Sequence, residues 1–266
     1  MSANAHDSVL LQSNLGIEDF VWDVEEWPSV KHDDFSGGGD LPVISLNAGE
    51  DIEVISKKMV EASEEWGFFR LVNHGVSREV IERFEEQCMG LFDLPMTHKM
   101  KGCRSNSLPL GYSASNPDYV QNLPWAEILQ LLQSPQQVLE FSRKIWGDQE
   151  QHHKLFSQAL IDYMSALENL GIKLLQLLAR GLHLPTDFFT RHFQEKESNM
   201  LRVNRYPPCP DPQKILGLGS HTDPHTLTIL LQDQVGGLQV LKDDRCWVGV
   251  RPIPNSFVVN TGDTLQ

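Results

Sequence analysis

The spacing of apolar residues changes along the chain from mainly helical to mainly strand-like. Over residues 51–65 they recur every three or four positions behind the acidic pair Glu50-Asp51, which predicts an amphipathic helix with acids at the positive end of its dipole. A second helix is predicted up to about residue 93. The longest predicted helix covers 155–182, and Gly181 marks its end.

Short β-rich runs predict strands near the first helix and in the last quarter of the chain. They cover 41–46, 66–72, 200–203, 227–231, 238–240 and 256–259. Between residues 105 and 146 prolines break any long period, so we expect turns and short pieces there. Because helices lead and strands follow, the pattern favours mixed α and β structure. Its core would be a double-stranded β-helix, or jelly roll, flanked by helices, and not alternating βαβ units.

The chain divides into four stretches that share one catalytic unit, because 266 residues are too few for several independent cores. They are a loose N-terminal leader (1–40), an N-terminal region (41–150), a long helix with its connection (151–198) and a partial jelly-roll core (199–266). The leader mixes acidic residues with Ser and Gly, a composition that cannot bury enough apolar surface to order itself.

Composition argues against two classes of partner. Acidic residues outnumber Lys and Arg by 36 to 22, and the resulting net charge of -14 disfavours nucleic acid, because phosphate contacts need clustered cations. No apolar run approaches the roughly 20 residues that cross a bilayer, so no membrane span is expected. Four widely spaced cysteines and the lack of a signal-peptide pattern fit a reducing cytosol or nucleus.

The sharpest chemical pattern is His221-Thr222-Asp223, just before the predicted strand 227–231. Residues two positions apart point to the same side of an extended backbone, so the imidazole and the carboxylate can reach one cation. They would supply two of the three ligands of a 2-His-1-carboxylate iron(II) site, which leaves positions open for a bidentate co-substrate and oxygen. Alone the pattern is weak, because most His-x-Asp triplets are surface turns.

Asn204 and Tyr206 offer hydrogen bonds from one face of the strand that precedes this triplet. They could orient a small dicarboxylate. The alternative is a strand that runs into the turn Pro207-Pro208, with Tyr206 as a half-buried aromatic whose hydroxyl is satisfied. Without the His-Asp pair, this alternative is the better interpretation.

Several short motifs follow one another in order along the chain. They are Leu41–Ile44, Trp66–Phe69, Val72–Val76, Phe92–Pro95, Asn204–Cys209, His221–Pro224, Leu227–Leu230 and Asp233–Val240. Together they resemble the plant 2-oxoglutarate- and iron(II)-dependent dioxygenases, and among these most of all the gibberellin oxidases. The match spans roughly residues 41–266, and so many motifs in order make chance agreement improbable.

The resemblance implies that His221 and Asp223 are iron(II) ligands, and that Asn204 and Tyr206 lie beside 2-oxoglutarate, with the tyrosine hydroxyl on its distal carboxylate. The keto acid end of the co-substrate would chelate the metal. Reaction with dioxygen, with ascorbate as reductant, would yield carbon dioxide and succinate and oxidise an unactivated C–H bond of a small-molecule substrate. The protein's implied part is positioning and exclusion of water, since the radical chemistry belongs to the cofactor.

The segment Leu123-Pro124-Trp125 resembles one found in gibberellin 20-oxidases, which implies a diterpenoid carboxylic acid as substrate. Such a substrate needs an apolar pocket with one cationic or hydrogen-bonding anchor. Gibberellin 2- and 3-oxidation, flavonoid oxidation and oxidation of other plant hormones stay open. Trp125 itself has an equal alternative as a core aromatic beside a proline turn.

Other histidines have simpler interpretations. His74 is expected to be a turn residue hydrogen-bonded to the backbone, and His152-His153 to lie on a solvated helix face. His225 is a rival ligand because it follows His221 by four residues. Ligation by both would require a bend after Pro224, and the second histidine of the family comes much later in the chain.

The family pattern includes a second histidine and an Arg-x-Ser pair some tens of residues beyond Gly262-Asp263-Thr264, whereas this sequence ends at Gln266. We therefore expect the chain as given to be truncated at its C-terminus, with weak affinity for iron and co-substrate and little or no activity. The alternative to an oxygenase is a non-catalytic fragment that acts by binding partners.

Overall fold

The chain forms two compact units, each assembled from three separate stretches. The computed structural model describes residues 15–28, 30–31, 33–35, 40–104, 110–114, 122–192, 199–242 and 246–265. The first unit comprises Met1–Pro28, Glu79–Ser165 and Glu195–Ser220, and the second Ser29–Arg78, Ala166–Gln194 and His221–Gln266. Each unit combines parts of several stretches that the sequence suggested, because its paired strands are far apart in the chain.

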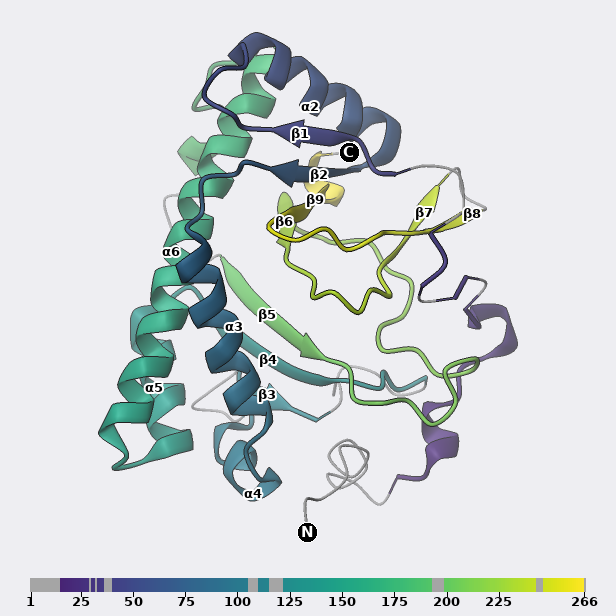
Figure 1. Ribbon diagram of the computed structural model, residues 1–266, viewed down its shortest axis with the longest axis vertical. Coiled ribbons are helices and arrows are strands. Elements are labelled where there is room, and N and C mark those ends of the chain that lie inside the picture. Colours follow the sequence, from purple (N-terminus) through teal and green to yellow (C-terminus); the bar gives the residue numbers. More distant parts are fainter. Residues whose placement is uncertain are drawn as a thin grey trace. The chain divides into compact units, whose positions relative to one another are not determined.

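Most of the regular elements before strand β5 are helices, and most of those after it are short strands joined by loops (Figure 1). The α-helices are α2 (Ile52–Trp66), α3 (Arg78–Phe92), α4 (Met96–Lys99), α5 (Pro135–Trp146) and α6 (Glu150–Gly181). The 3-10 helices are η1 (Ile17–Phe20), η2 (Val24–Glu26), η3 (Met100–Gly102), η4 (Thr190–His192) and η6 (Asp263–Leu265). The strands are β1 (Val43–Ser45), β2 (Phe68–Val72), β3 (Tyr112–Ser113), β4 (Glu127–Leu132), β5 (Met200–Arg205), β6 (Leu227–Leu230), β7 (Gln239–Lys242), β8 (Cys246–Gly249) and β9 (Phe257–Thr261). The predicted mixture of helices and strands is confirmed.

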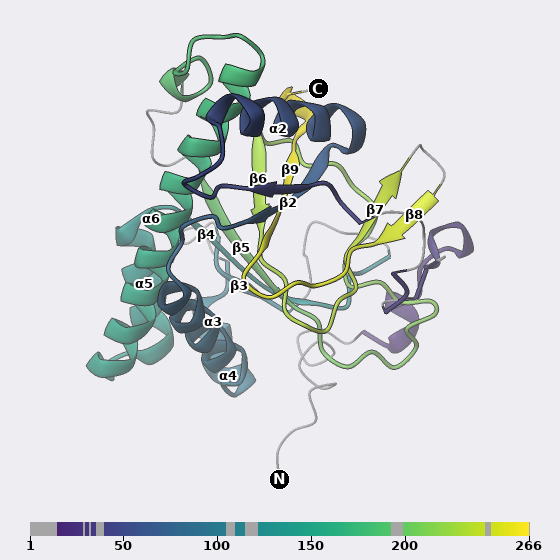
Figure 2. The ribbon, with the colours of Figure 1, turned by 45° about the horizontal axis from the view of Figure 1, so that its top comes forward.

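The second unit contains a four-stranded sheet in the order β1-β2-β9-β6. Strands β1 and β2 are parallel, whereas β9 pairs antiparallel with both β2 and β6. Helix α2 lies along β1 and β2 (Figure 2). Leu41, Val240, Val250 and Val258 form a buried cluster in this unit, and removal of this apolar surface from water stabilises β9 and hence the pairing of β6 with it.

Helix α2 is the first amphipathic helix that the sequence predicted. The side chain of Asp51 caps it by accepting a hydrogen bond of 2.9 Å from the backbone N–H of Glu53, and Gly67 ends it with a left-handed φ of 66°. The predicted longest helix is α6, observed over Glu150–Gly181. Among the described residues no helix is both long and apolar enough to cross a bilayer.

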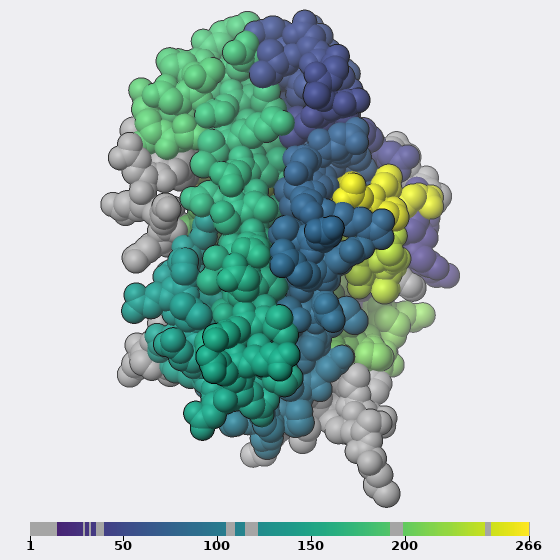
Figure 3. Space-filling view, turned by 60° about the vertical axis from the view of Figure 1, so that its left-hand side comes forward, coloured from purple at the N-terminus to yellow at the C-terminus, as the bar shows by residue number. Residues whose placement is uncertain are grey.

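The first unit contains a three-stranded antiparallel sheet in the order β3-β4-β5. In this unit α3 and α6 pack side by side (Figure 3): the rings of Phe84 and Tyr163 stack with centroids 3.8 Å apart, and Arg83 Nη2 lies 3.4 Å from Asp162 Oδ2. The aromatic stack is the stronger of the two contacts, because the ion pair is largely solvent-exposed and therefore contributes little.

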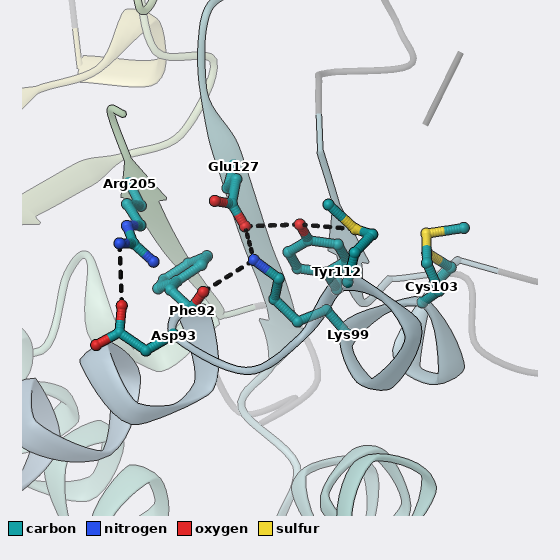
Figure 4. Close-up of polar contacts among 9 residues, drawn as sticks. Phe92, Asp93, Lys99, Cys103, Tyr112, Glu127 and Arg205 are labelled. Carbon is teal, nitrogen blue, oxygen red and sulfur yellow. Dashed lines mark hydrogen bonds and ion pairs between the residues drawn. The ribbon is translucent and has the colours of Figure 1, made fainter. Parts of the chain in front are cut away.

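A buried polar cluster fastens this sheet to α4 (Figure 4). Lys99 Nζ lies 2.5 Å from Glu127 Oε2 and donates to the carbonyl oxygen of Phe92 at 2.8 Å, and the Tyr112 hydroxyl donates to the same Glu127 oxygen at 2.6 Å. The two charged side chains are only 3% and 1% exposed, so each requires the other. Burial and the Glu127 carboxylate raise the pKa of Tyr112, which keeps its phenol protonated as a donor.

The same cluster is linked to β5, the strand that carries Asn204. Glu127 at the start of β4 is the register partner of Arg205 at the end of β5. Arg205 Nη2 in turn lies 3.0 Å from Asp93 Oδ1, just after α3 (Figure 4). Strand β5 is therefore fixed at this end both by its neighbour and by an ion pair.

Two elements lie where the sequence indicated only turns and short pieces, namely β4 and α5. Strand β4 is buried on both faces over most of its length, so its residues do not alternate between polar and apolar, and the period-two signal of a strand is absent. Helix α5 begins with Pro135 at its first position, a recognised start signal that the prolines elsewhere in the stretch obscured.

The prediction of a loose leader is wrong for residues 15–28. Phe20 and Trp22 are buried in the first unit, where the backbone N–H of Trp22 donates to the carbonyl oxygen of Lys214 at 3.0 Å and its indole N–H donates to that of Leu123 at 3.2 Å. Two large aromatic side chains supply the buried apolar area that the average composition of the leader did not reveal.

Candidate functional site

The imidazole of His221 and the carboxylate of Asp223 face each other in the second unit. Both lie in the segment 221–226, here called the His-Asp loop, which leads directly into β6. Nε2 of His221 is 3.5 Å from Oδ1 of Asp223. The predicted orientation of the two side chains toward the same side is therefore observed, although this segment is a loop and not part of the strand.

The other carboxylate oxygen of Asp223 is held by two side chains from the sheet. Thr228 Oγ1 on β6 donates to Oδ2 at 2.7 Å, and Asn260 Nδ2 on β9 donates to the same atom at 2.9 Å. The contact with His221, together with the bonds from Asn260 and Thr228, holds the pKa of Asp223 well below its usual range and outweighs the opposing effect of partial burial. Asp223 is therefore an anion at neutral pH.

The turn after β9 fastens the His-Asp loop from the other side. The backbone N–H of Asp263 donates to the carbonyl oxygen of Asp223 at 2.9 Å, and that of Gly262 to the carbonyl oxygen of Thr226 at 3.1 Å. The hydroxyl of Thr222 donates to Oδ2 of Asp263 at 3.0 Å. The His-Asp loop is thus tied to the turn after β9 through the backbone of Asp223 and Thr226 and the side chain of Thr222.

The geometry of this pair is compatible with binding of a divalent cation by both side chains. Two ligand atoms about 2.1 Å from one cation and at right angles to each other lie about 3.0 Å apart, close to the distance between Nε2 and Oδ1. An imidazole nitrogen and a carboxylate oxygen are also the donor types of a non-haem iron(II) site. Within the described residues no group of three or more His, Cys, Asp and Glu side chains is arranged to hold a metal.

Asn204 and Tyr206 lie in the first unit, at the end of β5 and just after it. Asn204 Oδ1 accepts a hydrogen bond of 2.9 Å from Nε of Arg202 on the same strand face. The ring of Tyr206 rests against Gly217 so closely that a Cβ at Gly217 would overlap it. Tyr206 is 53% exposed, yet the surrounding atoms desolvate its hydroxyl enough to raise its pKa, an effect that Arg202 and Asn204 oppose.

The two predicted pairs thus belong to different units, Asn204 and Tyr206 to the first and His221 and Asp223 to the second. That the two pairs line one site stays a prediction, as do their roles in binding iron and 2-oxoglutarate.

For the other histidines that the sequence singled out, the structure supports the simpler interpretations. His74 is a buried turn residue whose Nδ1 accepts from the backbone N–H of Val76 at 3.1 Å, as predicted. His152 is exposed and His153 only partly so. His225 follows Asp223 in the His-Asp loop, is exposed and does not join His221 and Asp223 in a three-residue cluster.

Trp125 is a core residue of the first unit. It is buried against Phe20, with ring centroids 5.0 Å apart in an edge-on arrangement, and Ile215 belongs to the same cluster. Its indole N–H donates to the carbonyl oxygen of Pro208 at 3.3 Å. Of the two interpretations that the sequence left open, the structure supports packing.

Thr228 and Asn260 are the functional candidates that sequence reasoning missed. Thr228 lies within a motif that carried the family resemblance, but it received no role there, and nothing singled out Asn260. The missing signal was strand pairing, because the register of β6 and β9 places the two residues directly opposite each other. Such a contact between distant parts of the chain has no local pattern.

Comparison with known families gives two matches. The model of the 2-oxoglutarate-Fe(II) oxygenase superfamily covers residues 197–266, and the N-terminal model of a non-haem dioxygenase in morphine synthesis covers residues 41–154. Gibberellin 20 oxidase 2 from Arabidopsis thaliana is 36% identical over 263 residues, an alignment that covers 96% of this chain and 67% of the relative. The chain belongs to the 2-oxoglutarate- and iron(II)-dependent oxygenase superfamily.

Relatives of this oxygenase include enzymes of different specificity. Naringenin,2-oxoglutarate 3-dioxygenase from Matthiola incana is also 36% identical, over 252 residues that cover 92% of this chain and 68% of the relative. The chain thus spans about two thirds of the length of these two curated relatives. Sequence identity therefore supports the oxygenase family without selecting between gibberellin and flavanone substrates.

Solved oxygenase structures have the same fold. The crystal structure of JOX2 in complex with 2OG, Fe and JA matches with a TM-score of 0.78 and 30% identity, over 99% of this chain and 74% of that one. A binary complex of the Arabidopsis thaliana dioxygenase for auxin oxidation 1 with 2-oxoglutarate matches with a TM-score of 0.69 and 29% identity, over 85% of this chain and 80% of that one. The predicted jelly-roll core flanked by helices, characteristic of these oxygenases, is confirmed, and with it the family's use of iron(II) and 2-oxoglutarate.

Proposed function

We propose that this oxygenase oxidises an unactivated C–H bond of a small apolar carboxylic acid, a gibberellin-like diterpenoid, and that His221 and Asp223 bind its iron(II). The observation that carries the metal assignment is the distance of 3.5 Å between His221 Nε2 and Asp223 Oδ1, in a loop whose backbone is bonded to the turn after β9. Similarity to gibberellin 20 oxidases, at 36% and 34% identity, supports the substrate class.

The chain's own residues bind and orient, while the cofactor pair of iron(II) and 2-oxoglutarate supplies the activation of dioxygen. Asp223 offers a permanent negative charge for the cation, since its pKa lies below the usual range. Tyr206, kept protonated by its raised pKa, would donate a hydrogen bond to a carboxylate of 2-oxoglutarate. Asn204 would lie beside the co-substrate and help to orient it. Ascorbate serves as the reductant that keeps the metal ferrous.

A second candidate substrate is a flavanone. Naringenin 3-dioxygenases from several plants are as similar to this chain as the gibberellin 20 oxidases, at 35–37% identity. A flavanone differs from a diterpenoid acid in having no carboxylate. The first candidate therefore predicts that oxidation requires a negatively charged carboxylate in the substrate, and the second predicts that it does not.

Metal and co-substrate binding can be tested with the chain itself. Under anaerobic conditions, adding iron(II) and 2-oxoglutarate should produce the visible charge-transfer absorption of a keto acid chelated to ferrous iron, and the band should be lost in His221→Ala and Asp223→Ala. His225→Ala is the matched control and should retain it. A band of equal strength in His221→Ala would refute the assignment of the ligands.

Substrate class can be tested by succinate formation. The expected turnover of this chain is low, so succinate is measured over long incubation with iron(II), ascorbate, oxygen and 2-oxoglutarate. A gibberellin precursor acid should raise that low rate above the rate without substrate, whereas its methyl ester and naringenin should not. Stimulation by naringenin and not by the acid would favour the flavanone candidate.

Location in the cytosol or nucleus stays part of the proposal. The four cysteines are free thiols in the described structure, which agrees with a reducing compartment.

A further inference from the structure

Asp223 presents its two carboxylate oxygens to different surroundings. Thr228 on β6 and Asn260 on β9 form a directly opposed pair in the antiparallel register, so their side chains lie on one face of the sheet. Both donate to Oδ2 of Asp223, at 2.7 and 2.9 Å. The other oxygen, Oδ1, is the one that faces Nε2 of His221.

We propose that Thr228 and Asn260 are positioning residues that hold Oδ2 of Asp223 and thereby present Oδ1 alone to a divalent cation beside His221. The inference rests on the proposed function, because it takes His221 and Asp223 as metal ligands. It goes further by assigning roles to two residues that do not touch the metal.

A carboxylate oxygen can accept only a limited number of hydrogen bonds. Each carboxylate oxygen accepts about two hydrogen bonds, so a hydroxyl and an amide together occupy Oδ2. A free carboxylate can bind a cation through both oxygens and would then take an additional coordination position. With Oδ2 occupied, Asp223 binds through Oδ1 only, and positions stay open for a bidentate co-substrate and oxygen.

Burial of Asn260 protects its hydrogen bond to Asp223 from competition by water. Asn260 is only 7% exposed, so water cannot readily replace its amide as the donor to Oδ2. Its neighbours on β9, Val258 and Val259, are buried as well. A polar amide at this position of the strand is explained by its bond to Asp223.

The test uses Mn(II) as a probe for the cation and measures its affinity, not turnover. Mn(II) is titrated into the full chain, and the free ion is followed by electron paramagnetic resonance. Thr228→Val and Asn260→Leu remove a donor with little change in volume, and each should weaken Mn(II) binding by about tenfold or more. Thr228→Ser retains the hydroxyl, so this variant should bind Mn(II) nearly as well as the wild type.

A purely structural role would give another pattern. If Thr228 and Asn260 only stabilise the sheet, both variants lower the melting temperature while the folded protein binds Mn(II) as the wild type does, and that result overturns the proposal. Asn260→Leu decides the matter if Thr228→Val does not fold, because each variant removes one of the two donors to the same oxygen.

An Asp223→Ala background tests whether the two residues act through this carboxylate. There Thr228→Val should cause no further loss of residual Mn(II) affinity, and an equal tenfold loss would overturn the proposal.

Failure of the proposed function looks different, because the wild type would then bind Mn(II) no better than His221→Ala. That result would remove both assignments, whereas a wild type that depends on His221 but not on Thr228 or Asn260 removes only this one.

Discussion

Gly262 lies against the backbone of His225 so closely that a Cβ atom at position 262 would overlap the carbonyl oxygen of His225, and also that of Asp223. The turn after β9 and the His-Asp loop are therefore in backbone contact. Only a residue without a side chain fits at this point.

Gly262→Ala should displace the His-Asp loop. The added methyl group must push two backbone carbonyls away, so we expect a loss of about 1–3 kcal/mol in the free energy of unfolding, as in other overpacked sites, together with weaker Mn(II) binding. Urea unfolding and the Mn(II) titration measure the two effects.

Gly90→Ala is the matched control for this substitution. Gly90 is exposed in α3 and a Cβ there meets no other atom, so alanine should leave Mn(II) binding unchanged and raise stability by up to about 1 kcal/mol. If Gly262→Ala behaves like Gly90→Ala, the turn after β9 does not constrain the loop.

The buried pair of Lys99 and Glu127 should be far more sensitive to loss of one partner than to loss of both. Glu127→Leu leaves the Lys99 ammonium buried without its counter-ion and also removes the acceptor of Tyr112, so we expect a cost of about 3–5 kcal/mol. The double variant Lys99→Met/Glu127→Leu should cost clearly less than the sum of the single changes, as measured by urea unfolding in a double-mutant cycle.

An exposed pair of the same chemistry provides the comparison. Lys57 Nζ and Glu61 Oε1 lie 3.6 Å apart on α2 with side chains 78% and 60% exposed, so Glu61→Gln should change stability by less than about 0.5 kcal/mol. Equal costs at Glu61 and Glu127 would show that the buried cluster does not hold the sheet of the first unit.

Gly217→Ala should displace the ring of Tyr206, because the added Cβ would overlap it. If Tyr206 donates to a carboxylate of 2-oxoglutarate, Tyr206→Phe should weaken co-substrate binding by about tenfold or more, and Gly217→Ala should weaken it in the same direction. Isothermal titration of 2-oxoglutarate into the Mn(II)-loaded chain measures both.

Combining the two changes tests whether they act together. In Tyr206→Phe, adding Gly217→Ala should cost little further affinity, since the hydroxyl that it displaces is already gone. Gly49→Ala, where a Cβ meets no other atom, is the control and should bind 2-oxoglutarate as the wild type does. Full additivity of the Gly217 and Tyr206 effects would argue against a role of the tyrosine hydroxyl.

Stability should fall as the pH rises through the range in which an unfolded thiol ionises. Burial, and in second place nearby Glu85, raises the pKa of Cys88 in the folded chain. Above about pH 8.5 the unfolded state releases this proton and the folded state keeps it, so unfolding becomes more favourable, by at most about 1.4 kcal/mol per pH unit. Urea unfolding between about pH 8 and about pH 9.5 should show a shallower decline in Cys88→Ala than in the wild type.

Leu91→Ala separates this effect from general weakening of the core. Leu91 is buried on the same helix, so its truncation should lower stability at every pH while retaining the slope of the wild type. Identical slopes in the wild type and Cys88→Ala would contradict the prediction.

Much of the fold and of the candidate site could be predicted from neighbouring residues alone. Periodic apolar residues behind Asp51 predicted α2, and the longest stripe predicted α6. The spacing of His221 and Asp223 predicted that their side chains turn to the same side. Such features depend on backbone geometry over a few residues, and a local pattern is sufficient to express them.

Local patterns failed where burial overrides them. Strand β4 is covered on both faces and so lacks alternation, and Phe20 and Trp22 are buried within a segment whose average composition is polar. Trp125 could have contacted substrate or core until the positions of Phe20 and Ile215 were known. In each case the deciding partner comes from a remote part of the chain.

The sequence by itself determined the family, the main helices and strands and the His-Asp pair, because these follow from residue type and short-range spacing. Only the tertiary structure decided which oxygen of Asp223 is held, since Thr228 and Asn260 meet through the pairing of β6 with β9. It also decided that Lys99 and Glu127 neutralise each other inside the first unit. A hydrogen bond or ion pair between distant residues depends on how strands and helices come together, and no local spacing records it.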